Sequence, residues 1–266
     1  YYFYGYKIFH MKKAFILAVS CICILASCDQ PKEKKSTNKY AEEPHSYAQP
    51  NNAVITHLDL NIDVNFDTHI ISGTATYNIA NNGASEIILD AKYLDISEVK
   101  ADGKQTAFTL GDMDNQLGQP LTIAIEENTK KIAITYKTTS KTEALQWLNA
   151  QQTADKTNPF LFTQGQAILT RSWIPIQDSP QIRITYNATV NVPSDLMAVM
   201  SAENPKKKTA DGIYNFKMVQ PIPAYLIALA IGDIEYKAIS ERTGVYAEKS
   251  MLDKVHSEFS DMEKMV

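Results

Sequence analysis

Hydrophobic and polar residues alternate singly along most of the chain, and this period of two restricts the fold more than any other feature. It is clearest in residues 58–66, where leucine, isoleucine, valine and phenylalanine are separated by aspartate and asparagine. The same pattern recurs in residues 71–79, 121–125, 132–136 and 182–192. A strand places successive side chains on opposite faces, so each run predicts a strand with one buried face. The sequence therefore predicts a mainly β fold, an antiparallel β-sandwich or barrel-like domain.

Turn signals separate these runs. Asn81, Asn82 and Gly83 form a strong hairpin signal, because Asn-Gly tolerates the positive φ of a tight turn. Residues 140–160 lack alternation, so we expect a long loop there, with Trp147 as a hydrophobic plug beneath it. Further strands are predicted at 87–89, 196–201, 214–220 and 224–231, the last apolar enough to be buried on both faces.

The composition suits a folded domain and excludes one class of partner. The chain has 266 residues, of which 44% are hydrophobic and 21% charged, enough for one large domain or two modest ones. Its formal net charge is -4 and its pI about 5.8, so it presents no basic field for a nucleic acid. Lys206, Lys207 and Lys208 lie beside Asp211 and Gly212, which predicts a solvated turn.

The N-terminal region resembles the export signal of a bacterial lipoprotein. Met11 and two lysines precede the apolar residues 14–26, a run that is too short to span a bilayer and suits a signal peptide. The run ends in the sequence Leu-Ala-Ser-Cys, the pattern of a lipobox, which makes Cys28 the expected lipid attachment site. An ordinary secretory signal cleaved nearby is the alternative.

These features divide the first fifth of the chain into three segments. We interpret residues 1–10 as a non-native extension, residues 11–28 as the lipoprotein signal peptide, and the polar residues 29–49 as a flexible tether. The protein is therefore expected to be a lipid-anchored membrane protein of the cell envelope that faces the periplasm or the exterior.

The C-terminal residues 248–266 change from a period of two to helical spacing. Met251, Leu252, Val255 and Phe259 fall on one face of a helix, with mostly charged residues opposite. Such a face needs a partner, and we expect the partner to lie in sequence beyond residue 266. On this interpretation the chain is a fragment cut inside its next domain.

No residue pattern in the chain identifies a catalytic centre. The five histidines include no pair spaced for an HExxH zinc motif, and neither a GxSxG motif nor a glycine-rich phosphate loop occurs. The three cysteines, Cys21, Cys23 and Cys28, all precede the predicted domain, so its body has no thiolate. We therefore assign no catalytic residue and no metal ligand to this chain.

One connection concentrates polar groups between the two sets of strands. Residues 164–180 carry several amides, Arg171, Asp178 and two prolines. Loops on a β scaffold often carry function, and buried polar groups usually satisfy backbone. This stretch is therefore either a substrate-binding edge or a well-packed crossover.

Six motifs follow one another in the second half of the chain. They are ALQWL at 144–148, PFLFTQGQAI at 159–168, QDSP at 177–180, VP at 192–193, MSA at 200–202 and PIPAYLIAL at 221–229. In this order they resemble the N-terminal β domain of the M1 family of zinc aminopeptidases, particularly its leukotriene A4 hydrolase branch. The resemblance covers residues 47–266.

The resemblance implies both an architecture and a function. Residues 50–234 would form the saddle-shaped N-terminal β domain, and residues 235–266 the truncated α/β beginning of a thermolysin-like catalytic domain. The complete enzyme would use zinc to remove N-terminal residues from peptides. In the family, the GxMEN and HExxH motifs lie beyond this point, so the fragment is expected to bind no zinc and to be inactive without its missing catalytic domain.

The resemblance also implies a substrate loop. Gln164, Gln166 and Ala167 would line the pocket for the N-terminal residue of the substrate, and the position of Gln166 is often a glutamate in the family. A neutral amide oxygen still accepts an N–H bond, but contributes less than a carboxylate facing a cation. We interpret Arg171 and Asp178 as loop-shaping groups, joined by a salt bridge or bonded to backbone.

A second hypothesis is a non-catalytic β-sandwich lipoprotein that binds peptides or an envelope protein. Deleting residues 248–266 would discriminate, because a finished module should lose stability and a truncated enzyme should not. The epoxide hydrolase activity of the leukotriene branch is a third hypothesis, and its residues would also lie downstream.

Overall fold

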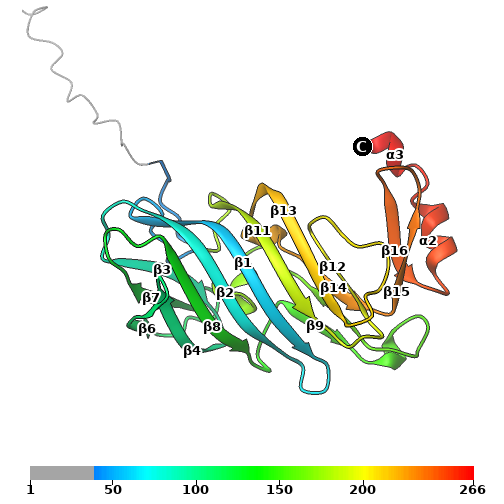
Figure 1. Ribbon diagram of the computed structural model, residues 1–266, viewed down its shortest axis with the longest axis horizontal. Helices are drawn as coiled ribbons and strands as arrows, with labels where there is room; N and C mark the ends of the chain where they lie inside the picture. The colour runs from blue at the N-terminus through cyan, green and yellow to red at the C-terminus, as the bar shows by residue number, and fades with distance from the viewer. Residues whose placement is uncertain (1–38) are drawn as a thin grey trace, which may run out of the picture. The chain divides into compact units, whose positions relative to one another are not determined.

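Strands dominate the computed structural model, which describes residues 39–266 (Figure 1). The predicted N-terminal extension, the signal peptide and Cys28 lie outside the described residues, as do residues 29–38 of the predicted tether. The largest sheet has seven strands in the order β13-β11-β1-β2-β8-β4-β5. Their bounds are β1 (Ala53–Asn65), β2 (Ile70–Asn81), β4 (Leu94–Ala101), β5 (Lys104–Gln105), β8 (Lys131–Thr138), β11 (Arg183–Asn191) and β13 (Ile213–Pro223).

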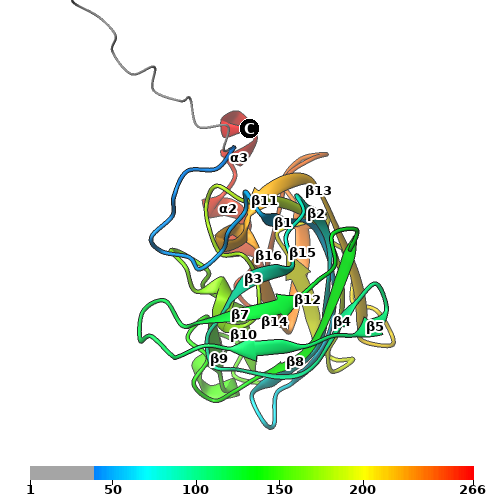
Figure 2. The same ribbon diagram turned by 90° about the vertical axis from the view of Figure 1, so that its left-hand side faces the viewer.

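Two smaller sheets and a hairpin complete the β structure. A three-stranded sheet, β3-β7-β6, and a four-stranded sheet, β12-β14-β10-β9, lie one after the other along the same face of the large sheet (Figures 1 and 2). Their bounds are β3 (Glu86–Ala91), β6 (Phe108–Leu110), β7 (Gln119–Ala124), β9 (Leu145–Leu148), β10 (Phe160–Thr163), β12 (Met197–Met200) and β14 (Leu229–Gly232). Three short 3-10 helices connect strands, namely η1 (Ala150–Gln152), η2 (Thr170–Ser172) and η3 (Ala224–Leu226). The predicted mainly β fold is confirmed.

One pair of strands in the large sheet runs parallel. Strand β11 pairs with β1 so that Leu58 lies opposite Tyr186 and Ile62 opposite Val190. The remaining neighbours in this sheet are antiparallel. The predicted antiparallel arrangement needs this one correction, and the chain between β1 and β11 must cross over from the end of one strand to the start of the other.

The Asn-Gly signal marks a turn but not a hairpin. Strand β2 pairs with β1 and β8, whereas β3 pairs with β7, so the chain changes sheets at this point. Gly83 has a φ of 91°, as the turn signal predicts. The side chain of Asn81 accepts a bond from the amide of Ala84 at 2.8 Å and donates to the carbonyl of Glu126 at 2.9 Å. These bonds direct the chain away from β2, and the predicted hairpin is wrong.

The predicted long loop around Trp147 contains a short strand. Strand β9 pairs with β10, and Trp147 is half-buried at the tip of the β1-β2 hairpin. Its ring stacks on His69 with centroids 4.9 Å apart, and Phe66 meets it edge-on at 5.2 Å. Trp147 therefore packs the tip of the β1-β2 hairpin against β9, the edge strand of the four-stranded sheet. The predicted plug beneath a long loop is wrong.

The predicted strand at 224–231 is also interrupted. It consists of η3 followed by β14, because Pro223 precedes η3 and the amide of Ile227 donates to the carbonyl of Ala224 at 2.9 Å. Only the second half of the apolar run is a strand, and Leu229 and Ile231 are buried there.

The C-terminal part forms a hairpin with two short helices. The elements are β15 (Ile234–Ala238), β16 (Gly244–Glu248), α2 (Leu252–Glu258) and α3 (Met262–Met265). The predicted single helix starts later, because Glu248 ends β16 and accepts bonds from the amides of Ala154 and Asp155 at 2.8 and 3.3 Å. Helix α2 packs against β15 and β16, so its apolar face has a partner within the chain, although Phe259 stays 46% exposed.

Residues 39–266 form one compact unit, so the expected domain division at residue 234 stays a prediction. Among the described helices, none is both long and apolar enough to cross a membrane.

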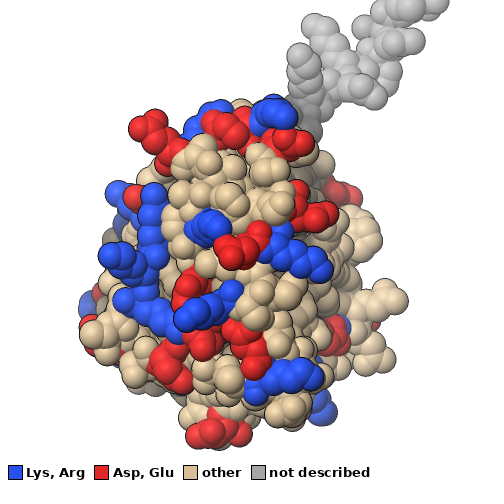
Figure 3. Space-filling view, turned by 90° about the vertical axis from the view of Figure 1, so that its right-hand side faces the viewer, with Lys and Arg blue, Asp and Glu red and all other residues tan. Residues whose placement is uncertain are grey.

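Lys208 bonds Asp233, and the amine of Lys206 lies 5.2 Å from the ring centroid of Tyr236. Figure 3 shows basic and acidic side chains interspersed at this end of the molecule. The predicted solvated lysine turn is confirmed, since residues 206–208 are all exposed.

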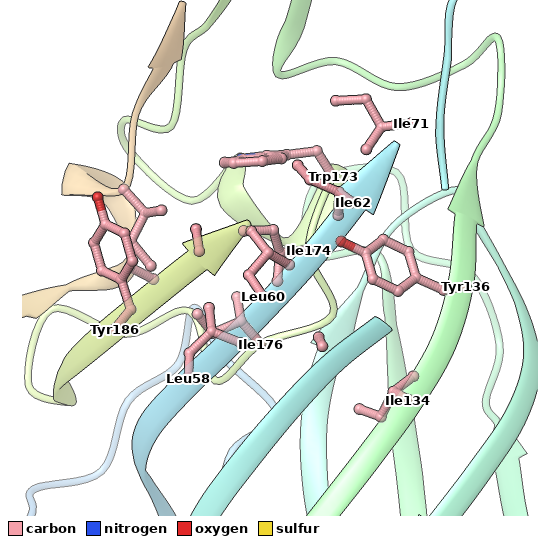
Figure 4. Close-up of a cluster of buried hydrophobic side chains, with 14 of the residues drawn as sticks. Leu58, Leu60, Ile62, Ile71, Ile134, Tyr136, Trp173, Ile174, Ile176 and Tyr186 are labelled. Atoms are coloured by element: carbon pink, nitrogen blue, oxygen red, sulfur yellow. The ribbon is translucent and has the colours of Figure 1, made fainter. Parts of the chain in front are cut away.

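The core lies between the large sheet and residues 173–180, here called the central stretch, which follow η2. Leu58 and Ile62 of β1 are fully buried, and Figure 4 shows them in one cluster with side chains from the central stretch. The residues contributed by that stretch are Trp173, Ile174 and Ile176, all 0% exposed. Burying one such aliphatic side chain stabilises a fold by roughly 1.5–3 kcal/mol, so the apolar half of the central stretch is firmly fixed.

Candidate functional site

Residues 164–169 form a tight loop directly after β10. Gln164, Gln166 and Ala167 are exposed, whereas Gly165 is buried. The amide of Leu169 donates to the carbonyl of Gly165 at 2.8 Å, which closes the loop, and the peptide bond between Gln166 and Ala167 is cis. The structure therefore brings the three predicted site residues together on one solvent-facing turn, and their contact with a substrate stays a prediction.

Close packing fixes the inner side of this loop. A Cβ atom on Gly165 would lie 2.8 Å from the carbonyl oxygen of Tyr225 and 2.9 Å from the hydroxyl of Thr170. Thr170 is fully buried, and its hydroxyl donates to the carbonyl of Ala224 at 3.0 Å. The motifs at 159–168 and 221–229 are therefore in contact, although 56 positions separate Gly165 from Pro221.

The two ends of the loop are linked through Ala144, one directly and the other through Ser172. The backbone amide of Gln164 donates to the carbonyl of Ala144 at 2.8 Å. The backbone amide of Ala144 donates to the hydroxyl of Ser172 at 3.0 Å. The Ser172 hydroxyl in turn donates to the carbonyl of Leu169 at 2.8 Å. The exposed amides are thus carried by a backbone that is held on both sides.

A buried arginine lies beside the loop, between two carboxylates. Nε of Arg171 is 3.3 Å from Asp178 and Nη1 is 3.6 Å from Asp90, and all three side chains are at most 2% exposed. The guanidinium also donates to the carbonyls of Leu117 and His45, both at 2.7 Å. The predicted salt bridge between Arg171 and Asp178 is confirmed. Asp90 was missed, and a lone aspartate within the apolar run 87–91 was the signal available.

Burial controls how these carboxyl groups titrate. Desolvation raises the pKa of Asp178 to about 6, and the nearby Arg171 opposes the rise. Desolvation also raises the pKa of Asp90, against Arg171 and bonds donated by Ser46 and by the amide of Tyr47. Two carboxylates share one guanidinium, so mildly acidic pH protonates Asp178 more readily than an exposed aspartate.

The described residues do not fit the zinc ion that the family resemblance implies. Within residues 39–266, no group of three or more histidine, cysteine, aspartate or glutamate side chains is placed to hold a metal. His57 bonds the hydroxyl of Thr185 at 2.6 Å, and His256 bonds the carbonyl of Ala238 at 3.0 Å.

A family profile and a curated relative match most of the chain. The profile, described as the peptidase M1 N-terminal domain, matches residues 43–226. Leukotriene A-4 hydrolase of Xenopus laevis is 37% identical over 236 residues, which cover 84% of this chain and 39% of the relative. The chain thus spans about two fifths of the length of that protein.

Solved structures share the fold. Native yeast LTA4 hydrolase superposes with a TM-score of 0.79 at 33% identity, covering 86% of this chain and 36% of that one. A variant M1 zinc metallopeptidase of Deinococcus radiodurans, bound to a Tyr-Ser-Ala substrate, superposes with a TM-score of 0.56 at 19% identity, covering 73% of this chain and 46% of that one. The second likeness concerns the fold alone. Taken with the profile match, these findings confirm the predicted resemblance, and the chain belongs to the M1 peptidase family, whose N-terminal domain it contains.

Proposed function

We propose that this chain is the substrate-pocket and scaffold domain of a zinc-dependent aminopeptidase that removes N-terminal residues from peptides. The loop with Gln164, Gln166 and Ala167 contacts the first residue of the substrate. Zinc, held by the rest of the complete enzyme, supplies carbonyl polarisation and an activated water. Membership of the M1 family supports this proposal.

The observation that carries the proposal is the pair of exposed amides on a backbone fixed at both ends. An amide side chain offers one acceptor oxygen and two N–H donors, so Gln164 and Gln166 can bond both a substrate amine and a peptide carbonyl. A loop that is already ordered loses little conformational entropy on binding. Because both groups are neutral, a carboxylate elsewhere in the complete enzyme must provide the charge that faces the α-ammonium group.

Binding at this loop can be tested with the chain itself. We expect the tripeptide Tyr-Ser-Ala to shift the backbone NMR signals of residues 164–169 in a titration, and its N-acetylated form to shift them less. Gln166→Ala should weaken the response, whereas Gln105→Ala, an exposed glutamine on β5, should not. Equal responses to the two peptides, or equal losses in the two variants, would contradict the assignment of the loop.

The inactivity of the isolated chain is a separate part of the proposal. The purified chain with zinc should not hydrolyse fluorogenic aminoacyl substrates, because its described residues offer no metal site. Zinc-dependent turnover by a contaminant-free sample would show that this part is wrong.

We further propose that Cys28 carries a lipid that anchors the protein in the cell envelope. The support is the Leu-Ala-Ser-Cys sequence alone, which lies outside the described residues. Metabolic labelling with palmitate should mark the wild type but not Cys28→Ser, and the variant should leave the membrane fraction. Labelling that survives the substitution would refute the anchor.

A second candidate is a non-catalytic lipoprotein that binds peptides or an envelope protein. It is favoured by the packing of α2 on β15 and β16, which covers much of a helix face that the sequence suggested was unpartnered. The DNA downstream of the Val266 codon separates the candidates. An in-frame continuation into GxMEN and HExxH supports the peptidase, and a stop codon supports the binding module.

A further inference from the structure

Residues 40–48, here called the arm, are docked on the domain although their composition predicted part of a flexible tether. Two amide side chains each hold both backbone groups of one arm residue. Asn51 bonds the N–H and the carbonyl of Tyr40 at 3.1 and 2.8 Å, and Gln181 does the same for Ala41 at 3.0 and 3.3 Å. The arm thus forms no strand pair, and side chains satisfy its backbone instead.

The buried ion cluster holds the other end of the arm. Asp90 accepts the amide of Tyr47 at 2.7 Å and the hydroxyl of Ser46 at 2.6 Å. Arg171 donates to the carbonyl of His45 at 2.7 Å. Three successive arm residues are therefore bonded to two buried, oppositely charged side chains, and bonds to charged groups are stronger than neutral ones.

The same cluster is continuous with the candidate substrate loop. Arg171 belongs to η2, whose first residue, Thr170, packs against Gly165 and whose last residue, Ser172, bonds the carbonyl of Leu169. Asp178 accepts both the backbone amide and the Nε of Arg171, at 3.1 and 3.3 Å. Displacement of the arm would leave Asp90 and Arg171 short of partners inside the protein, and η2 would have to move to restore them.

We propose that Arg171 and Asp90 are positioning residues that fix the candidate substrate loop by binding the arm, so that docking of residues 40–48 sets the rigidity of residues 164–169. Its significance for peptide recognition rests on the function proposed above. The arm then has a role beyond that of a tether, because its bonds to Asp90 and Arg171 help to hold the loop in place.

Hydrogen exchange of the full chain tests the proposal. The variant Ser46→Ala/Asn51→Ala removes arm contacts without altering Arg171, Asp90 or the loop. We expect exchange of the amides of Leu169 and Ser172, which are bonded within the loop and η2, to accelerate about tenfold or more, the effect of losing one or two buried hydrogen bonds. Exchange in β8 reports global stability and should stay unchanged.

His45→Ala is the matched control, because the His45 ring is 70% exposed while its carbonyl, which Arg171 binds, is retained. This variant should leave exchange in the loop unchanged. Acceleration in the arm alone, acceleration that is equal in β8 and the loop, or no acceleration would each overturn the proposal. The peptide titration is independent: if loop exchange accelerates but wild type binds no peptide, the coupling holds and the proposed function fails.

Discussion

Replacing Arg171 with methionine is expected to lower the free energy of unfolding by about 3–5 kcal/mol, the usual cost of breaking a buried ion pair from one side. The native guanidinium lies between Asp90 and Asp178 and donates to the carbonyls of His45 and Leu117. Methionine fills much of the space but donates no hydrogen bond. Because Arg171 also donates to the carbonyl of Asp178, two buried carboxylates and three carbonyls lose a partner together.

The loss should depend on pH in a defined direction. Desolvation already raises the pKa of Asp178 to about 6 and that of Asp90 above its usual range, and removing Arg171 raises both further. In the variant, mildly acidic pH protonates these carboxyl groups and removes the cost of burying them charged. The difference in unfolding free energy between wild type and variant should therefore be larger at pH 8 than at pH 5.

Urea unfolding followed by far-ultraviolet circular dichroism measures both quantities. Arg183→Met is the control, because Arg183 is exposed on β11 and its replacement should change stability by no more than about 0.5 kcal/mol. A loss below about 1 kcal/mol for Arg171→Met at pH 8, or a loss that does not shrink at pH 5, would refute the argument that the cluster is held by charge.

Three further variants address other features. Tyr136→Phe should leave thermal stability unchanged or raise it by up to about 1 kcal/mol, because the buried hydroxyl has no partner among the described residues; a clear loss would reveal one. Gly165→Ala should cost about 1–3 kcal/mol in urea unfolding, because its Cβ meets the carbonyl of Tyr225; a neutral result would mean that the loop yields freely. The raised pKa of Asp178 means that folding takes up a proton between about pH 4 and 6, so its contribution to stability falls as pH rises through that window. Asp178→Asn should remove this slope, and titration of the unfolding free energy would show an unchanged slope if the assignment is wrong.

The strands were largely predictable because their signal is local. Alternation over 182–192 predicted β11, which spans Arg183–Asn191, and its buried residues are the apolar ones of the pattern. Pairing was not predictable in the same way. Nothing within β11 specifies that it lies parallel to β1, since that choice depends on the packing of strands more than a hundred residues apart.

The candidate site shows the same limit. Arg171 and Asp178 lie seven positions apart on one connection, and their opposite charges led to the correct ion pair. Asp90 enters from a different sheet, so no spacing in the sequence links it to Arg171. The arm was interpreted as part of a flexible tether because its side chains are mostly polar. Its docking instead uses backbone amides and carbonyls, which composition does not reveal because nearly every residue has them.

The parallel pairing of β1 with β11 explains why residues 164–180 combine a rigid part with an open one. A parallel pair cannot be closed by a tight turn, so the intervening chain has to cross over before β11 begins. Near its end, Trp173 and Ile176 are buried in the core shared with β1, while Gln164 and Gln166 remain exposed beside the four-stranded sheet. Core packing and the buried ion pair of Arg171 with Asp178 therefore order the segment, while the amides of Gln164 and Gln166 stay available to a ligand. A preorganised binding loop requires this combination of a buried, ordered part and exposed polar side chains.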